Sequence, residues 1–238
     1  LLENAVNNEE LTYFLDCNVT RDFNFKTFIE LSEINDFSKV TIVNCRDVLR
    51  KDGQPNLFAE AFNNLNHLTY LNLGNTCPKD LMFATILSKI LSKHTSLTSL
   101  DLSNCQHFDY LAGAEELIIE SLKNLINLKS LTLKSSTIFY KGKTSWADLC
   151  AILSTFENLE HLDISGIWIY NYDEKLIAQA LKNKNLLTHL SLDVLHFQEP
   201  ELIESIKKMN KLTYFSVGDI NSSSPYQDDE IKKVIEAL

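Results

Sequence analysis

The segment Leu97-Thr-Ser-Leu100-Asp-Leu102 contains the leucine spacing that decides the fold. The same L-x-x-L-x-L spacing, with Ile, Phe or Val in place of some leucines, begins at residues 68, 97, 128, 159, 187 and 212. Phe37-Ser-Lys-Val40-Thr-Ile42 is a degenerate seventh copy, and residues 11–14 begin another that fits the pattern less well. A pattern that recurs every 20 to 50 residues or so indicates a stack of repeated units.

Each interval between these copies also contains a stretch with helical periodicity. From residue 37 onward, the starting positions advance by 31, 29, 31, 31, 28 and 25 residues. Within residues 83–91, apolar side chains recur at positions i, i+3, i+4, i+7 and i+8, and they therefore share one face of a helix. We expect comparable helices over residues 57–65, 115–125, 146–156, 174–181, 201–209 and 228–238.

A single strand-helix unit cannot bury both its leucine row and the apolar face of its helix, so the units must stack on one another. The sequence therefore predicts a curved α/β solenoid, or horseshoe, with parallel strands on the concave face and helices on the convex face. We assign residues 37–238 to about seven repeats that end in a C-terminal helix. We assign residues 1–36 to an N-terminal cap or a degenerate first repeat.

The repeat resembles leucine-rich-repeat (LRR) proteins of the ribonuclease-inhibitor-like class, which have long repeats with a helix in each. The resemblance covers roughly residues 37–238 and implies a binding role, because that family consists mostly of binding proteins. The leucines themselves are fold residues and do not specify a function. The three arginines, far outnumbered by lysines, and the irregular repeat lengths are similar to LRR effectors that intracellular bacterial pathogens secrete into host cells. That second resemblance implies a host protein as partner.

Composition narrows the classes of partner and compartment. The chain has 238 residues and a net charge of -10, which opposes binding to a phosphate backbone, and it lacks an apolar run long enough to span a membrane. We expect neither nucleic acid nor membrane as a partner, and we expect a monomer. The five cysteines contain no Cys-x-x-Cys pair, which predicts reduced thiols in the cytoplasm, or in the host cytosol for an effector. Because the sequence begins at Leu1, we expect it to be part of a longer protein.

The residues between the leucines should point outward onto the concave face, since side chains alternate along a strand. One column combines aromatic, imidazole and short polar residues, and the next contains mostly short polar and acidic ones. From these columns we select six candidate partner-binding residues: Tyr70, Asp101, His161, Asp163, His189 and Tyr214. The alternative is that a sheet facing water simply favours short polar side chains without any ligand.

Aromatic residues also follow the strands, in the connections that lead to the helices. We name these residues the aromatic rim and expect them to contact a partner: Phe108, Tyr110, Phe139, Tyr140, Trp168, Tyr170 and Tyr172. Tyr and Trp bury much area at modest entropic cost, which makes them frequent interface anchors. The alternative is that long connections fold back and pack these rings as small satellite cores.

The sequence gives little support for catalysis or metal binding. His161 and His189 should lie about 5 Å apart on neighbouring strands near Asp163, which could suit a metal, but nothing in the sequence fixes the geometry. A Ser191-His-Asp set would lack a pocket and an oxyanion site. The sequence contains no phosphate-binding, dinucleotide-binding or zincin motif. We therefore expect no enzyme activity, cofactor or metal, and we expect Lys182-Asn-Lys184 to be a solvated convex surface or a helix end rather than a membrane-docking site.

These observations predict a protein–protein interaction module that binds through the concave face and the aromatic rim, and that acts as a bacterial effector on host proteins. The alternative is a substrate-recognition or adaptor arm, for example of a ubiquitin ligase, for a catalytic part encoded outside this chain.

Overall fold

The computed structural model describes residues 2–7, 10–16, 40–44, 59–60, 62, 65–75, 81–105, 114–136, 143–167, 173–192 and 199–217. Its strands are β1 Leu2–Asn7, β2 Glu10–Asp16, β3 Val40–Asn44, β4 Tyr70–Asn72, β5 Ser99–Asp101, β6 Ser130–Thr132, β7 His161–Asp163, β8 His189–Ser191 and β9 Tyr214–Ser216. Its helices are α4 Leu81–Lys93, α5 Ala114–Leu122, α6 Lys143–Thr155, α7 Glu174–Leu181 and α8 Pro200–Lys207.

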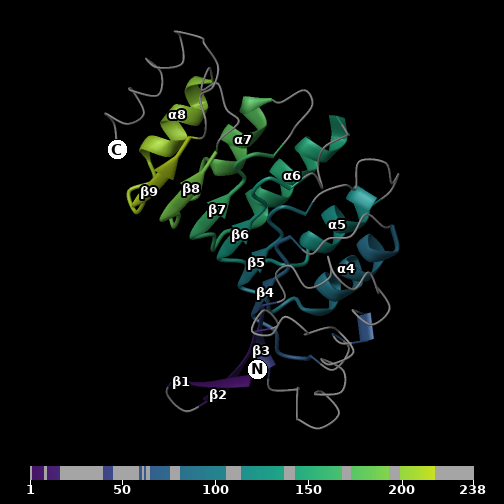
Figure 1. The fold of residues 1–238 in the computed structure, drawn as a ribbon. Helices are drawn as coiled ribbons and strands as arrows, with labels where there is room; N and C mark the ends of the chain where they lie inside the picture. Colours follow the sequence, from purple (N-terminus) through teal and green to yellow (C-terminus); the bar gives the residue numbers. More distant parts are fainter. Residues whose placement is uncertain are drawn as a thin grey trace.

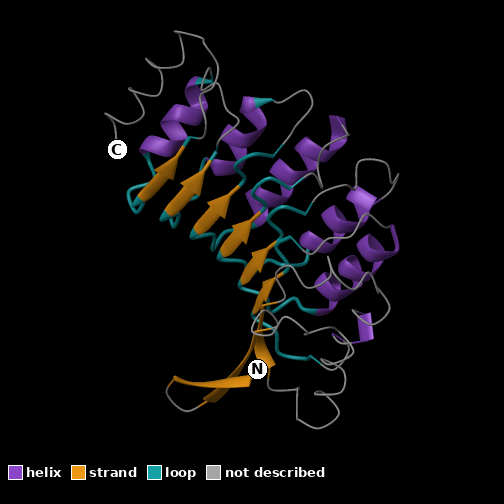
Figure 2. Ribbon diagram, in the orientation of Figure 1, coloured by secondary structure: helices purple, strands orange, loops and turns teal. Residues whose placement is uncertain are grey.

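The strands form one curved sheet in which chain order and spatial order coincide. β1 pairs with β2 in the antiparallel sense, and every pairing from β2 to β9 is parallel. Figures 1 and 2 show α4 to α8 on the convex side of this sheet. The predicted α/β solenoid is confirmed. β1 and β2 belong to the same sheet as the repeats. The predicted boundary at residue 36 between a cap and the repeats stays a prediction.

The leucines stack in register because each repeat places them at the same position along its strand. Leu100 on β5 pairs with Leu71 on β4 and with Leu131 on β6, and all three side chains are completely buried. Helix residues such as Leu87 and Leu153 complete the same core. Burying such a side chain contributes about 1.5–3 kcal/mol, so stacking of the repeats stabilises each of them.

The helices agree with the periodicity of the sequence. α7 has the bounds predicted for it, and α4, α5, α6 and α8 differ from the predicted ranges by a few residues at their ends. Asp173 caps α7, since its side chain accepts a hydrogen bond from the Lys175 backbone N–H at 2.9 Å. The predicted helix at 228–238 lies outside the described residues.

A tight turn after each strand uses the left-handed backbone region. Asn75, Asn104, Ser135 and Gly166 occupy equivalent positions and have φ values of 58°, 53°, 52° and 63°. Asn and Gly are the residues that tolerate this region best, so Ser135 carries the most backbone strain of the four. The turn directs the chain away from the sheet toward the convex side.

Two titratable residues occupy a core position of the repeat. Three residues before the first leucine of each strand pattern, the chain has one buried side chain per repeat: Leu65, His94, Leu125, Phe156, Lys184 and Met209. Lys184 lies just beyond the end of α7, one of the two places expected for it, but it is not solvated, because the residue is only 4% exposed. Its Nζ donates to the carbonyl oxygens of Ser154 and Phe156, at 2.9 and 2.8 Å, and thereby satisfies the C-terminal end of α6.

One expectation about the cysteines is also wrong. Cys105 is disulfide-bonded, whereas all five cysteines were expected to be reduced. Cys150 is a free, buried thiol, so the partner of Cys105 lies outside the described residues. Cys105 itself is buried, and its Sγ lies 3.7 Å from the Leu73 carbonyl oxygen.

Candidate functional site

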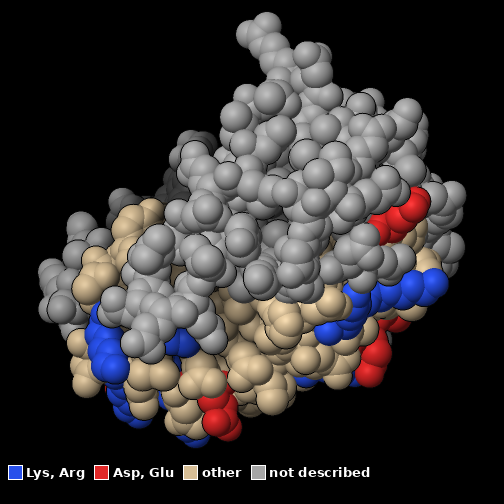
Figure 3. Space-filling view, turned by 90° about the horizontal axis from the view of Figure 1, so that it is seen from below, with Lys and Arg blue, Asp and Glu red and all other residues tan. Residues whose placement is uncertain are grey.

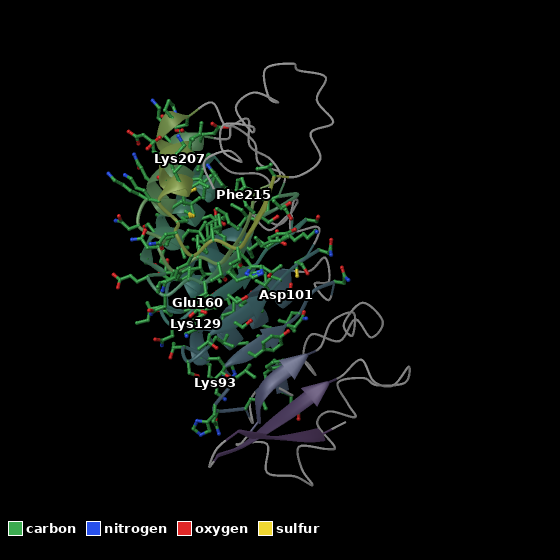
Figure 4. All side chains as sticks on the ribbon, turned by 90° about the vertical axis from the view of Figure 1, so that its left-hand side faces the viewer. Lys93, Asp101, Lys129, Glu160, Lys207 and Phe215 are labelled. Atoms are coloured by element: carbon green, nitrogen blue, oxygen red, sulfur yellow. The ribbon has the colours of Figure 1, made fainter. Side chains whose placement is uncertain are left out.

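The concave face contains two rows of residues that run across the strands. The first row comprises Tyr70, Ser99, Ser130, His161, His189 and Tyr214, and the second comprises Asn72, Asp101, Thr132, Asp163, Ser191 and Ser216. Each residue pairs in register with the next member of its row. Neighbouring strands are about 4.8 Å apart, so adjacent members of a row can contact each other. Figure 4 shows Asp101 on this side of the sheet.

Three rings of the first row form a stack, which we name the ring stack: His161, His189 and Tyr214. The ring centroids of His161 and His189 lie 5.3 Å apart, and those of His189 and Tyr214 lie 5.6 Å apart. The sequence-based expectation that the two histidines lie about 5 Å apart is confirmed. Tyr214 is 52% exposed, and His189 is exposed as well. The stack is therefore partly exposed to solvent, on a face whose other residues, apart from Tyr70, have short polar or acidic side chains.

Thr188 links the stack to the preceding repeat. Its hydroxyl donates to the Glu160 carbonyl oxygen at 3.0 Å. Thr188 Oγ1 also lies 3.0 Å from His189 Nδ1, and which of these two atoms donates depends on the tautomer of the ring.

His161 is a weaker base than an ordinary histidine. Partial burial is the main cause of its lowered pKa, and the neighbouring His189 ring lowers it further. The carboxylates of Asp163 and Asp101 act in the opposite direction but do not compensate. The lowered pKa favours the neutral form of the His161 ring, which lies within electrostatic range of both carboxylates.

Asp101 and Asp163 each have a structural role that sequence reasoning missed. Asp101 Oδ1 accepts the Ser103 backbone N–H at 2.8 Å, and Asp163 Oδ1 accepts the Ser165 backbone N–H at 2.9 Å. Asn72, in the same row, accepts the Gly74 backbone N–H at 2.9 Å in the same way. An Asp or Asn followed two residues later by a turn residue is the signal that could have revealed this role.

The six concave candidates do not all meet. Four of them lie on the adjacent strands β7 to β9: His161, Asp163, His189 and Tyr214. Asp101 lies two strands from β7, on β5, and the half-buried Tyr70 lies on β4. The seven residues of the aromatic rim lie outside the described residues, and their role stays a prediction.

An ion pair joins the two residues that directly precede β6 and β7. Lys129 Nζ is 3.0 Å from Glu160 Oε1, across the starts of β6 and β7 (Figure 4). Both side chains are about half exposed, so the pair contributes less than about 1 kcal/mol. The Glu160 carboxylate therefore offsets the charge of Lys129 at this edge of the sheet.

The described residues provide few groups that could catalyse a reaction or bind a metal ion. Ser191 is 8% exposed, which makes it a poor nucleophile for an external substrate. In the part of the chain that the structure describes, no group of three or more His, Cys, Asp or Glu side chains could hold a metal ion. None of the described helices is long and apolar enough to cross a membrane. Figure 3 shows small groups of both charges separated by uncharged surface.

The parallel strands, the stacked leucines and the helix in each repeat define the class: this is a leucine-rich-repeat fold. Among solved structures, the chain is similar to the leucine-rich repeat-containing protein LegL7 from Legionella pneumophila, with a TM-score of 0.52 and 18% identity, over 90% of this chain and 69% of that chain. This level of identity shows the fold alone.

A second match, the tropomodulin C-terminal domain from Caenorhabditis elegans, covers 90% of this chain and 92% of that chain at 11% identity. Its TM-score of 0.32 is too low to indicate a shared fold. No protein-family model matches the sequence, and no curated protein matches it either.

Proposed function

We propose that this chain is a noncatalytic module that binds a partner protein through its concave face. The observation that supports this proposal is the ring stack of His161, His189 and Tyr214, which is partly exposed on an otherwise small and polar sheet surface. Exposed rings cost solvation free energy unless a partner covers them, and interface anchors are enriched in such residues. The aromatic rim is proposed as a second contact region.

The experiment compares capture of partner proteins from eukaryotic lysate by the wild type and two variants. The concave variant His161→Ser/His189→Ser/Tyr214→Ser removes the ring stack. The control Ile126→Ser removes a side chain that is 59% exposed and lies outside the concave rows. A protein captured by wild type and control but lost by the concave variant supports the proposal. A partner that the concave variant retains, or no partner at all, contradicts it.

We further propose that the partner is a host protein and the chain an effector. The Lys-rich, Arg-poor composition supports this proposal, and the similarity to LegL7 adds agreement of fold only. Capture of the same partner from bacterial lysate would contradict the effector role. The adaptor alternative predicts that the captured partner becomes ubiquitylated when the longer protein is supplied, and absence of this modification would contradict it.

A further inference from the structure

We infer that Cys77 is the disulfide partner of Cys105, and that this crosslink encloses one complete repeat. Cys105 is disulfide-bonded, and its partner lies outside the described residues. Cys150 is free, so the partner within the chain is Cys17, Cys45 or Cys77. The strand register and the reach of the chain decide among these three. The inference goes beyond the proposed function, because it does not involve a binding partner.

The first argument is the direction of the Cys105 side chain. Its Sγ lies 3.7 Å from the carbonyl oxygen of Leu73, which directly follows β4 in the preceding repeat. Cys105 is completely buried, so its sulfur lies inside the stack of repeats and not at the surface. The sulfur therefore faces the segment that follows β4, and Cys77 is the cysteine of that segment.

The second argument is the course of the two chain segments beyond their strands. β4 and β5 pair in parallel. The segments stay side by side after the strands, because the Asn75 backbone N–H donates to the Ser103 carbonyl oxygen at 2.8 Å. Cys77 follows Asn75 by two residues, just as Cys105 follows Ser103. Two residues span at most about 7 Å, so the chain cannot carry Cys77 far from this pair of segments.

The same register places the other two cysteines too far from Cys105. Cys45 directly follows β3, and Cys17 directly follows β2. β3 is two strands from β5, and β2 is three strands from it. Strands are about 4.8 Å apart, so these separations are about 10 and 14 Å, whereas the Cα atoms of a disulfide lie within about 7 Å of each other. Only β4 lies one strand spacing from β5 and precedes a candidate cysteine.

The crosslink closes a covalent ring around one repeat. The segment from Cys77 to Cys105 contains α4 and β5. In a solenoid each repeat contacts only its neighbours, so one part of the stack can open without the rest. A disulfide restricts the conformations of the opened segment and thereby opposes this opening. The disulfide therefore stabilises the repeat of α4 and β5 more than the repeats that carry the ring stack.

The crosslink forms by exchange with a disulfide oxidant such as oxidised glutathione. The Cys77 thiolate attacks the glutathione disulfide and releases one molecule of reduced glutathione. The Cys105 thiolate then attacks the Cys77 sulfur of the mixed disulfide and releases the second molecule. One disulfide is consumed and one is formed, and two protein thiols are replaced by two glutathione thiols. Once formed, the crosslink resists exchange, because the Cys105 sulfur is completely buried.

Peptide mapping without reductant tests the pairing directly. The full chain is equilibrated with oxidised and reduced glutathione, its remaining thiols are alkylated, and it is digested with trypsin. Cleavage after Lys and Arg places each of the five cysteines in a different peptide: residues 1–21, 40–46, 52–79, 94–123 and 144–175. The expected product joins residues 52–79 to residues 94–123. A bond from residues 94–123 to any other peptide, or an alkylated Cys105, overturns the inference.

Hydrogen exchange tests the stabilisation of the enclosed repeat. Reduction of the wild type should accelerate amide exchange in α4 and β5 at least about tenfold and leave exchange in α7 and β8 unchanged. Cys77→Ser should show the fast exchange with or without reductant. Cys17→Ser/Cys45→Ser is the matched control and should respond to reductant as the wild type does. Equal exchange in the oxidised and reduced wild type, or a response to reductant that Cys77→Ser retains in α4 and β5, overturns the inference.

Discussion

Replacement of His94 by leucine should stabilise the protein, and the gain should be larger in acid. His94 is 1% exposed and occupies the core position that holds leucine in two other repeats. Neither of its ring nitrogens makes a hydrogen bond of good geometry among the described residues, although the Phe62 carbonyl oxygen is near enough to favour the protonated ring. An unsatisfied buried polar group costs about 1–3 kcal/mol, and His94→Leu removes that cost at every pH.

The pH dependence follows from the basicity of the buried ring. Burial is the main cause that lowers the His94 pKa from 6.5 to about 4, Lys93 lowers it further, and the nearby Phe62 carbonyl opposes both. The unfolded chain binds this proton more tightly than the folded chain does. Protonation of His94 therefore leaves the free energy of unfolding unchanged above pH 6.5 and lowers it increasingly as the pH falls toward 4. At pH 5.0, about 1.5 pH units below the unfolded value, the loss is about 1.5 × 1.36, or roughly 2 kcal/mol.

The assay measures the free energy of unfolding in urea at pH 7.5 and pH 5.0. The wild type should lose about 2 kcal/mol more than His94→Leu between these two pH values. His67→Asn serves as a control, since His67 is exposed one residue before the first leucine of its repeat. This control should lose as much stability as the wild type.

The reasoning is refuted if His94→Leu loses as much stability on acidification as the wild type. That result would mean that the ring is protonated in the folded state or accessible to water. A variant less stable than the wild type at pH 7.5 would show instead that the imidazole has a partner that compensates for its burial.

Three further predictions concern the same repeats. Burial lowers the Lys184 pKa to about 8, against the opposing effect of a nearby glutamate, so stability should rise as the pH increases from 8 toward 10.5. Lys184→Met should abolish that rise in urea denaturation. Gly166→Ala should cost about 1–2 kcal/mol for its left-handed backbone, plus a clash, because the added Cβ would lie 2.7 Å from Ser135 Oγ. Ser135→Gly should stabilise the wild type and reduce that cost, and a double-mutant cycle measures the coupling. Trp146 Nε1 donates to the Asp173 carbonyl at 3.2 Å, so Trp146→Phe should lower the midpoint of thermal unfolding.

The fold could be predicted from the sequence because every repeat must bury its row of leucines in the same way. Leu100 and its equivalents are buried, and the period of the pattern specifies how the units stack. The row positions of His161 and His189 followed from the same register, so their contact could be predicted as well.

The turn roles of Asp101 and Asp163 were not predicted, since they depend on the backbone two residues later and not on periodicity. The burial of Lys184 was missed because a lysine between two asparagines has the composition of a surface loop. Only its alignment with Phe156 and Met209 in other repeats reveals the core position. The disulfide of Cys105 could not be read from cysteine spacing, which contains no paired motif.

Comparison of equivalent positions in different repeats separates structural polar residues from functional ones. Lys184 is unusual in its column, but the carbonyl oxygens of α6 account for its charge within the chain. Asp101 and Asp163 share their turn hydrogen bond with Asn72, so the turn accounts for an oxygen or amide side chain at this position of the repeat. A polar residue that recurs at one position because the backbone turn needs it does not by itself indicate a ligand.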